Sequence, residues 1–434
     1  MRKRFLSMTF AAAFIATACT GGGGASGAPT GGTGATNPPA GSAGTGGESQ
    51  APNFDPSTIS GEVTLGQWES SPAEGTALKS ALDAFAVKYP NIKVTQTTVA
   101  GDYRAQMVNK FGAGDVPDLF YVNAEYAPEW MSQGFLLPLD DYINNQGFDT
   151  APFFPDYLSI FQQDGTTYGL PKDGNTIAMA VNTDLVPNPP KTMDELVQVA
   201  TSLKGKSGLK APMCLNASLD RGLAFIYAQG GSLLTDDNTA SAIDTPESTQ
   251  AVQWYMDLFK NGLGQTNTQL GDGWCGEALG KGDVAIVFEG GWLKGAMDAF
   301  PKIKWQFAEM PTGSSGSPVT INYTAAYGIG QDSKNKDQAW VLMQYLTGPE
   351  GMAKWTEGGI AVPSRSDVAV PEGFDVIVKG ADYAKPGSGF MPAYPDVIKA
   401  FGDAFLKQVT DKKYDAATVV AATKSAIEQA LSSQ

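Results

Sequence analysis

The run Gly280–Trp292, GKGDVAIVFEGGW, is the stretch that most constrains the fold of this chain. Val284–Phe288 is apolar, largely β-branched and bounded by glycines, which is typical of a strand buried on both faces of a parallel sheet. In open α/β sheets, ligands bind at the carboxyl ends of the strands. The run therefore predicts an α/β fold with a crevice beside Glu289.

The residues that end this strand suit a neutral sugar. Glu289 offers a hydrogen-bond acceptor, Gly290 and Gly291 let the backbone approach closely, and Trp292 offers a broad ring. Hydroxyl groups require hydrogen bonds, whereas the C–H face of a pyranose can stack on an aromatic ring. An indole here can equally cap the core, and the sequence leaves that alternative open.

Length and composition exclude several functions. A chain of 434 residues is too long for one core and suggests two domains. A formal net charge of −15 disfavours nucleic acid and anionic membrane surfaces as partners. The absence of histidine removes Ser/His and Cys/His catalysis and imidazole metal ligands. We expect no metal and no other cofactor. Enzymes built on carboxylates remain an alternative.

The amino terminus has the pattern of a signal peptide. A basic start and an apolar run too short to span a bilayer lead to Cys19. This pattern resembles bacterial lipoprotein signals, which implies that residues 1–18 are removed and that lipid on Cys19 anchors the protein at the extracellular face of the cell membrane. Residues 19–58 are rich in Gly, Ser, Thr, Ala and Pro, which predicts a flexible tether reaching roughly 35 Å.

Hydrophobic periodicity predicts a βαβ unit at the start of the folded part. Glu62–Gln67 and Ile92–Thr98 are predicted strands, and the apolar positions from Leu78 to Tyr89 have helical spacing that stops at Pro90. The same patterns predict strands at Asp118–Val122, Ile177–Val181 and Ala326–Gly330, a helix at Thr192–Leu203, and a helix containing Trp340, Met343 and Leu346.

Eight short segments carry a family resemblance. They are FAVKYPNIKV (85–94), GDVPDL (114–119), GFLLPLD (134–140), YGLPKDGNTIAMAVNTD (168–184), PPKTMDEL (189–196), GDVAIVFEGGW (282–292), AWVLMQYLTGPEG (339–351) and GGIAVPSR (358–365). In this order they resemble the extracellular sugar-binding proteins of ABC importers, the family that includes maltose-binding protein. The resemblance implies a substrate-binding subunit that captures a mono- or oligosaccharide between two lobes and delivers it to the membrane permease.

The resemblance also implies a fold class. It is an α/β, periplasmic-binding-protein-like fold with two interleaved lobes, hinge strands and a central ligand cleft. We expect lobe one at residues 59–173 and 326–371, and lobe two at 178–321 and 377–434. The expected partners are a carbohydrate ligand and ABC permease subunits in the membrane, with no nucleic acid, and we expect a monomer.

The resemblance places candidate ligand contacts at several strand ends and loops. Carried over by position, they are Trp68, Glu69, Asn123, Glu125, Lys172, Asp173, Asn175, Asp220, Arg221, Gly291 and Trp292. Glu289 is added as the carboxylate that ends the strand Val284–Phe288. Trp274, Tyr323, Tyr327, Arg365 and Tyr394 are added because they lie at predicted strand ends or loops near the cleft, where a structural role is the alternative. Asp102 is added as a loop carboxylate, and for Asp102, Glu69 and Glu125 solvated surface is the alternative.

Two of these positions depart from the family pattern. Asn175 stands where maltose-binding protein has a carboxylate, while Asp173 supplies one two residues earlier, and this argues against a maltodextrin preference. Gly291 replaces the proline of the family's Gly-Pro-Trp motif. Lys172 beside Asp173 can also be read as a simple exposed ion pair.

Cys214 and Cys275 both fall in the expected lobe two. Because extracellular proteins form disulfides, we predict that they pair, which would close a loop of about 60 residues and stabilise by roughly 4 kcal/mol. Two buried free thiols are the alternative. A metal site lacks further soft ligands.

Other functions stay open at this stage. One is a secreted carboxylate-dependent carbohydrate-active enzyme, which would need a carboxylic acid of raised pKa opposite a second carboxylate. A second is an ABC binding protein for a non-sugar solute, such as a glycerol-phosphate ester or a polyamine. A third is an adhesin that displays a folded head.

Overall fold

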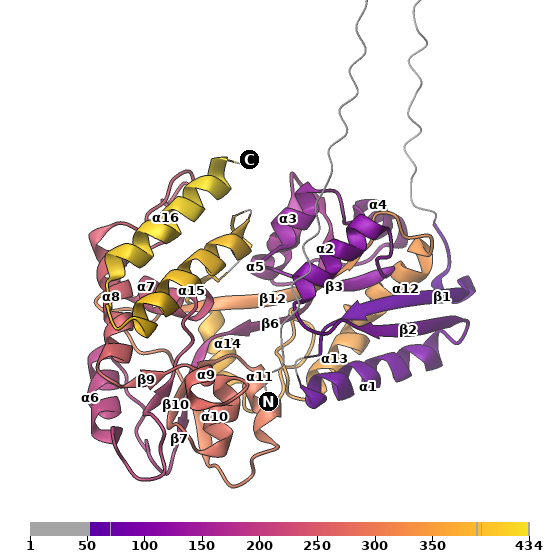
Figure 1. Ribbon diagram of the computed structural model, residues 1–434. Helices are drawn as coiled ribbons and strands as arrows, with labels where there is room; N and C mark the ends of the chain where they lie inside the picture. Colours follow the sequence, from indigo (N-terminus) through magenta and orange to yellow (C-terminus); the bar gives the residue numbers. More distant parts are fainter. Residues whose placement is uncertain (1–52, 70, 388, 392, 433–434) are drawn as a thin grey trace, which may run out of the picture. The chain divides into compact units, whose positions relative to one another are not determined.

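The computed structural model describes residues 53–432 apart from residues 70, 388 and 392 (Figure 1). The predicted signal peptide, Cys19 and the predicted tether up to residue 52 lie outside the described residues. The last residues of the predicted tether belong to the folded part, because Phe54 packs edge-on against Tyr142 with 6.5 Å between ring centroids. A short 3₁₀ helix, Pro56–Thr58, follows and leads into the first strand.

The described strands form two main sheets, and each sheet is the centre of one lobe of an α/β fold. In lobe one, the sheet order is β13-β12-β3-β1-β2, with β6 also paired to β12. These strands are β1 (Gly61–Gln67), β2 (Ile92–Thr98), β3 (Leu119–Asn123), β6 (Gly169–Thr176), β12 (Thr320–Ile329) and β13 (Ala384–Pro386). A small hairpin of β4 (Gln162–Gln163) and β5 (Thr166–Thr167) lies apart from this sheet.

The predicted βαβ unit is confirmed. Strand β1 pairs in parallel with β2 along its whole length, and α1 (Pro72–Lys88) connects them. The Ser71 side chain caps α1 by accepting a hydrogen bond from the backbone N–H of Glu74, and the helix ends two residues before Pro90. The predicted strand at Asp118–Val122 is β3, one residue later, which places Asn123 and Glu125 at its carboxyl end.

The sheet of lobe two has the order β11-β7-β10-β8-β9. Its strands are β7 (Ala178–Asn182), β8 (Met213–Cys214), β9 (Gly264–Gln265), β10 (Ile286–Glu289) and β11 (Trp305–Ala308). The strand predicted at Val284–Phe288 is β10, buried as expected, but its surroundings are not all parallel. It runs parallel to β8 and antiparallel to β7, which begins two residues after the crossing strand β6 ends.

Strands β6 and β12 connect the two lobes. They pair antiparallel from Gly169 opposite Gly328 to Thr176 opposite Asn322, with an irregularity between Ala325 and Ala326. At one end of β12, Ile329 belongs to the core of lobe one, and at the other end Ile321 belongs to the core of lobe two. The interleaving implied by the resemblance therefore rests on two adjacent, hydrogen-bonded strands, drawn side by side in Figure 1.

Helices cover both sheets. Around the first sheet lie α2 (Tyr103–Ala113), α3 (Ala127–Ser132), α4 (Asp140–Gln146), α5 (Pro155–Leu158), the 3₁₀ turn η2 (Ser159–Phe161), α12 (Lys336–Leu346) and α13 (Pro349–Glu357). Around the second lie α6 (Met193–Leu203), α7 (Leu219–Ala228), α8 (Pro246–Lys260), α9 (Asn267–Leu270), α10 (Cys275–Lys281), α11 (Trp292–Met297), α15 (Tyr394–Thr410) and α16 (Ala416–Ser432). Helix α14 (Asp375–Ala381) packs on the crossing strands through the Thr176 hydroxyl, which donates to the carbonyl of Ile377 at 2.8 Å.

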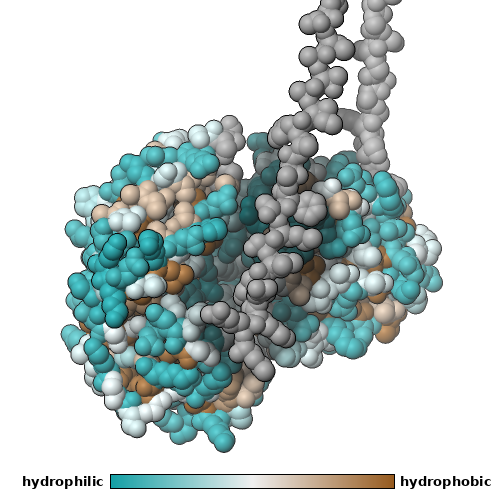
Figure 2. Space-filling view, viewed as in Figure 1, coloured by the Kyte–Doolittle hydropathy of each residue, from teal (hydrophilic) through white to brown (hydrophobic). Residues whose placement is uncertain are grey.

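The predicted disulfide is confirmed. Cys214 at the end of β8 is bonded to Cys275 at the start of α10, with 5.3 Å between their Cα atoms, so the alternative of two free thiols is wrong. Within the described residues, no helix is long and apolar enough to cross a membrane. Hydrophilic residues dominate the face drawn in Figure 2.

Candidate functional site

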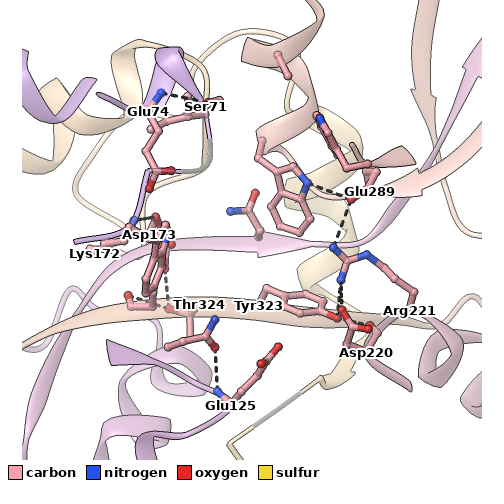
Figure 3. Close-up of a pocket in the computed structure, with 18 of the residues that line it drawn as sticks. Ser71, Glu74, Glu125, Lys172, Asp173, Asp220, Arg221, Glu289, Tyr323 and Thr324 are labelled. Atoms are coloured by element: carbon pink, nitrogen blue, oxygen red, sulfur yellow. Dashed lines mark hydrogen bonds and ion pairs between the residues drawn. The ribbon is translucent and has the colours of Figure 1, made fainter. Parts of the chain in front are cut away.

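A cavity of about 660 Å³ is lined by both lobes and by the crossing strands (Figure 3). Predicted site residues make up much of its wall: Trp68, Asn123, Glu125, Lys172, Asp173, Asn175, Asp220, Arg221, Trp274, Glu289, Trp292 and Tyr323. They come from strand ends and loops that are far apart in the sequence. The fold therefore brings together groups that the sequence indicated one at a time.

Three predicted residues are held inside the lobes, away from the cavity. Tyr327 lies in the middle of β12, with its ring 5.4 Å from that of Tyr121, because β12 begins at Thr320 and not at the predicted Ala326. Arg365 is paired with Asp367 at 2.8 Å. Tyr394, at the start of α15, is fully buried in the core of lobe two.

Three other predicted residues do not line the cavity. Asp102 caps helix α2, since its carboxylate accepts a hydrogen bond from the backbone N–H of Ala105 at 3.0 Å. Glu69 is exposed on the turn after β1. Gly291 contributes backbone only: its N–H donates to the Asn175 side-chain oxygen at 3.0 Å.

Sequence reasoning missed part of the wall. The missed residues are Ser71, Glu74, Asn216, Asn267, Gly273, Ala296, Thr324, Ala325, Trp355 and Ile360. Trp355 lies within α13, three residues after buried Met352, so its spacing indicates core. Asn216 follows β8, a strand of two residues that is too short to recognise from a pattern. Thr324 and Ala325 were findable, because they lie on a crossing segment that the resemblance implies.

The first of two charged clusters, the Lys172 cluster, belongs to lobe one. Lys172 pairs with Asp173 at 2.6 Å, and the two side chains are only 4% and 11% exposed. The Lys172 ammonium lies 3.9 Å from the ring centroid of Trp355 and 4.6 Å from that of Tyr121. The Trp355 indole N–H also donates to the Asp173 carboxylate at 3.1 Å. The Lys172–Asp173 pair is therefore buried, and its reading as an exposed ion pair is wrong.

The second, the Arg221 cluster, belongs to lobe two. The Arg221 guanidinium donates to the Asp220 carboxylate at 2.8 Å and to the Tyr323 hydroxyl at 2.9 Å, and it reaches Glu289 at 3.3 Å. The Trp292 indole N–H donates to the same Glu289 oxygen at 3.0 Å. Figure 3 draws this arrangement as a chain of contacts from Glu289 through Arg221 to Asp220. The predicted residues Asp220, Arg221, Glu289, Trp292 and Tyr323 thus form one network.

Burial and charge shift several pKa values at the site. Burial raises the pKa of Glu289, and the Arg221 charge together with the hydrogen bonds from Trp292 and Arg221 opposes that shift. Burial would lower the pKa of Arg221, but the neighbouring Tyr323, Glu289 and Asp220 hold it above its ordinary value. Burial, with the Asp220 charge, raises the pKa of Glu125 to about 7, and the Arg221 charge opposes this.

Close packing fixes the aromatic walls. A Cβ atom on Gly290 would come within 2.3 Å of the Trp292 ring, and one on Gly291 within 2.5 Å of both Asn175 and Phe374. These glycines are needed for space, as the sequence predicted. Trp292 is half-buried: it packs against the core of lobe two and also lines the cavity, and its contact with a ligand stays a prediction.

The arrangement combines indole faces with many hydrogen-bonding groups. Carboxylates and the amides of Asn123, Asn175, Asn216 and Asn267 can hydrogen-bond a polyhydroxylated solute, while indoles can cover its apolar faces. The volume is within the range of small-molecule sites. Among the described residues, no group of three or more Cys, Asp or Glu side chains is arranged to hold a metal ion.

Two lobes around a shared cavity define a two-lobed α/β binding protein, and comparisons with known proteins identify its family. The family model described as "Bacterial extracellular solute-binding protein" matches residues 69–353, and the chain belongs to this family. A binding protein of Brucella abortus (strain 2308) is 28% identical over 356 residues, covering 78% of this chain and 85% of the relative. The maltotriose-binding protein of Pyrococcus abyssi is 25% identical over 359 residues, covering 79% and 76%.

The fold is that of solved ABC substrate-binding proteins. The protein Lmo0181 of Listeria monocytogenes, solved in complex with cycloalternan, superposes with a TM-score of 0.77 at 20% identity, covering 86% of this chain and 99% of that one. The predicted two-lobed fold and family are thereby confirmed. The family and this structural neighbour are solute-binding proteins.

Proposed function

We propose that this chain is the sugar-binding subunit of an ABC importer. The observation that carries the proposal is the cavity between the lobes, where the indoles of Trp68, Trp274, Trp292 and Trp355 share a wall with carboxylates and amides. Each class of group matches one part of a sugar: the rings cover C–H faces and the polar groups bind hydroxyls.

Capture and delivery follow from the two-lobed arrangement. A sugar that contacts both lobes favours a closed form, and closure about β6, β12 and the segment near residues 372–376 would present a composite surface to permease subunits in the membrane. We assign lobe one to residues 59–173 and 326–371 and lobe two to 178–321 and 377–434, with the protein acting as a monomer. The relative in Pyrococcus abyssi named for maltotriose supports a sugar as solute.

The site of action is proposed to be the outer face of the cell membrane. Cleavage before Cys19 and lipid on its thiol would give lasting membrane residence, and residues 19–52 would act as the tether. Support comes from the sequence pattern and from membership of an extracellular family. A Cys19→Ser variant is expected to be released from the membrane or left unprocessed. A processed variant that stays bound to the membrane contradicts lipidation.

A thermal-shift screen tests the sugar proposal. Mono- to tetrasaccharides are added to the protein, and a true ligand raises the unfolding temperature because binding adds RT ln(1 + [L]/Kd) to the free energy of unfolding. Calorimetry then gives the affinity of each ligand found. If no sugar stabilises the protein while a polyamine or a glycerol-phosphate ester does, the non-sugar alternative replaces this one.

A carbohydrate-active enzyme is the second candidate, because one observation favours it. Glu125 has a pKa of about 7 and faces Asp220, which is the kind of carboxyl pair that glycoside hydrolysis uses. Incubation with labelled oligosaccharides separates the two candidates. A binding subunit leaves them intact, and cleavage that is lost in Glu125→Gln would establish the enzyme.

A further inference from the structure

The charged groups around the cavity are not balanced. Its lining contains five carboxylates and two cations: Glu74, Glu125, Asp173, Asp220 and Glu289 against Lys172 and Arg221. Both cations already have partners within the protein, since Lys172 is paired with Asp173 and Arg221 with Asp220 and Glu289. An anionic solute would meet surplus negative charge in a partly desolvated site, whereas a cationic solute would be attracted.

Glu125 is the carboxylate best placed to use this surplus. Its backbone N–H donates to the Asn123 side chain at 2.9 Å, but among the described residues no hydrogen bond or ion pair is recorded for its carboxylate. Glu125 follows β3 in lobe one, but the charges of Asp220 and Arg221, on α7 in lobe two, shift its pKa. Two carboxylates from opposite lobes thus share one region of the cavity, labelled in Figure 3.

We propose that the solute is a sugar carrying a basic nitrogen, an amino sugar, and that Glu125 and Asp220 bind this nitrogen together across the two lobes. This inference rests on the proposed sugar-binding function. An ionised Glu125 would be repelled by Asp220 on the facing lobe, and a cation placed between the two carboxylates turns that repulsion into two attractions. The indoles at the site add a face for the sugar ring, which a flexible polyamine would not need.

Binding of an amino sugar should also change the protonation of Glu125. Besides burial, the groups that shift the pKa of Glu125 are Asp220 and Arg221 on α7, and Glu125 in turn helps to raise the pKa values of Tyr126 beside it, Tyr323 on β12 and Tyr394 on α15. Since the pKa of Glu125 is about 7 without ligand, much of it is protonated at neutral pH. A bound cation favours the carboxylate, so binding of an amino sugar should release protons.

Matched pairs of sugars test the inference. Glucose, galactose, mannose and cellobiose are each compared with the 2-amino form, as glucosamine, galactosamine, mannosamine and the glucosamine disaccharide. Calorimetry is done at about pH 6.5, where a primary amine is charged. We expect tighter binding of the amino member in the pairs that bind. Neutral members that bind equally or more tightly overturn the inference and leave the proposed function intact. If no sugar of either kind binds, both are contradicted.

The Glu125→Gln variant tests the assigned residue. It should weaken binding of the amino sugar about 10- to 100-fold and binding of the neutral partner by a clearly smaller factor, because the amide of Gln can still hydrogen-bond a hydroxyl group. Glu62→Gln, which removes an exposed carboxylate paired with Lys93 on β2, should change neither affinity. Equal losses for both members of a pair overturn the inference, because they indicate a general role for Glu125.

A measurement on the unaltered protein avoids dependence on that variant. Binding enthalpies in two buffers of different ionisation enthalpy report the protons exchanged. The amino sugar should release a fraction of a proton at about pH 6.5, whereas a neutral sugar should not. Proton uptake with the amino sugar would overturn the inference even if Glu125→Gln failed to fold.

Discussion

The Lys172 cluster and the Arg221 cluster both place a cation beside carboxylates and aromatic rings, but they differ in exposure. The Lys172 side chain is 4% exposed and the Arg221 side chain 13%, and Asp220 reaches 23%. Lys172 is packed against rings and has one carboxylate partner, whereas Arg221 is shared between two carboxylates and a hydroxyl.

This difference separates two tasks within one cavity. The buried Lys172–Asp173 pair holds the crossing strand β6 against α13. Removing one member of the pair would leave the charge of the other unpaired in the interior. Both clusters line the cavity, but the Arg221 cluster is more exposed and has groups that can exchange partners with a solute. We infer that the first cluster mainly stabilises the fold and the second mainly recognises the ligand.

The largest expected effect is on the Lys172 cluster. Lys172→Met leaves the Asp173 charge buried, and we expect a loss of about 3 to 5 kcal/mol in the free energy of unfolding, measured by denaturant titration. Lys93→Met removes an exposed pair with Glu62 and should cost under about 1 kcal/mol. Arg221→Met should cost less than Lys172→Met, because Glu289 can take up a proton. If Arg221→Met cost more stability than Lys172→Met, the Lys172 cluster would not be the one that mainly stabilises the fold.

The disulfide gives the next effect, since it supports the wall beside the Arg221 cluster. Replacing both Cys214 and Cys275 by Ala opens a link between residues 61 apart, and the expected loss is about 2 to 4 kcal/mol. Because Trp274 precedes Cys275 and Asn216 lies two residues after Cys214, ligand affinity should fall as well. Unfolding and calorimetry on the double variant check both. Unchanged affinity in the folded variant would show that the wall holds without the link.

Much of the fold was predictable because its signals are local. Strands β1, β2 and β3 and helix α6 follow alternation or helical spacing, and their limits agree within about one residue. Strand β12 was predicted to begin six residues late, because Thr320–Ala325 mixes polar and apolar residues where it passes between the lobes. That error moved Tyr327 to a strand end, although it lies inside the core.

The site was predictable where residues follow a recognisable strand. Asn123 ends β3 and Glu125 follows it, and Glu289 and Trp292 come at the end of β10. Trp355 was not predictable as a site residue, because a tryptophan within an amphipathic helix is usually part of the core. Only the tertiary structure shows that its indole N–H donates to Asp173. Asn267 begins a helix of four residues, too short to show periodicity.

A variant of Trp292 tests whether the Arg221 cluster mainly recognises the ligand. If its indole covers about 100 Å² of a sugar ring, Trp292→Ala should lose roughly 2.5 kcal/mol of binding, a 50- to 100-fold weaker affinity. The fold should lose less than in Trp340→Ala, which removes a fully buried indole at about 3 to 5 kcal/mol. Calorimetry and melting curves on both variants decide. A large loss of stability with intact affinity would assign Trp292 to the core alone.

The smallest expected effect concerns pH and Glu125, the carboxylate beside the Arg221 cluster. The pKa of Glu125 is raised to about 7 in the folded protein, whereas an unfolded glutamate has its ordinary value near 4.5. Between these values the folded state holds more protons than the unfolded state, so the contribution of Glu125 to stability falls as pH rises from about 4.5 to 7. Because Glu125 retains contact with solvent, we expect a change on the order of 1 kcal/mol.

Ligand-free Glu125→Gln should lack this part of the pH dependence. The measurement is the difference between the unfolding free energies of the variant and of the unaltered protein from about pH 4.5 to 7. Parallel pH profiles would mean that burial and the Asp220 charge do not raise the pKa of Glu125, which would contradict its placement beside the Arg221 cluster.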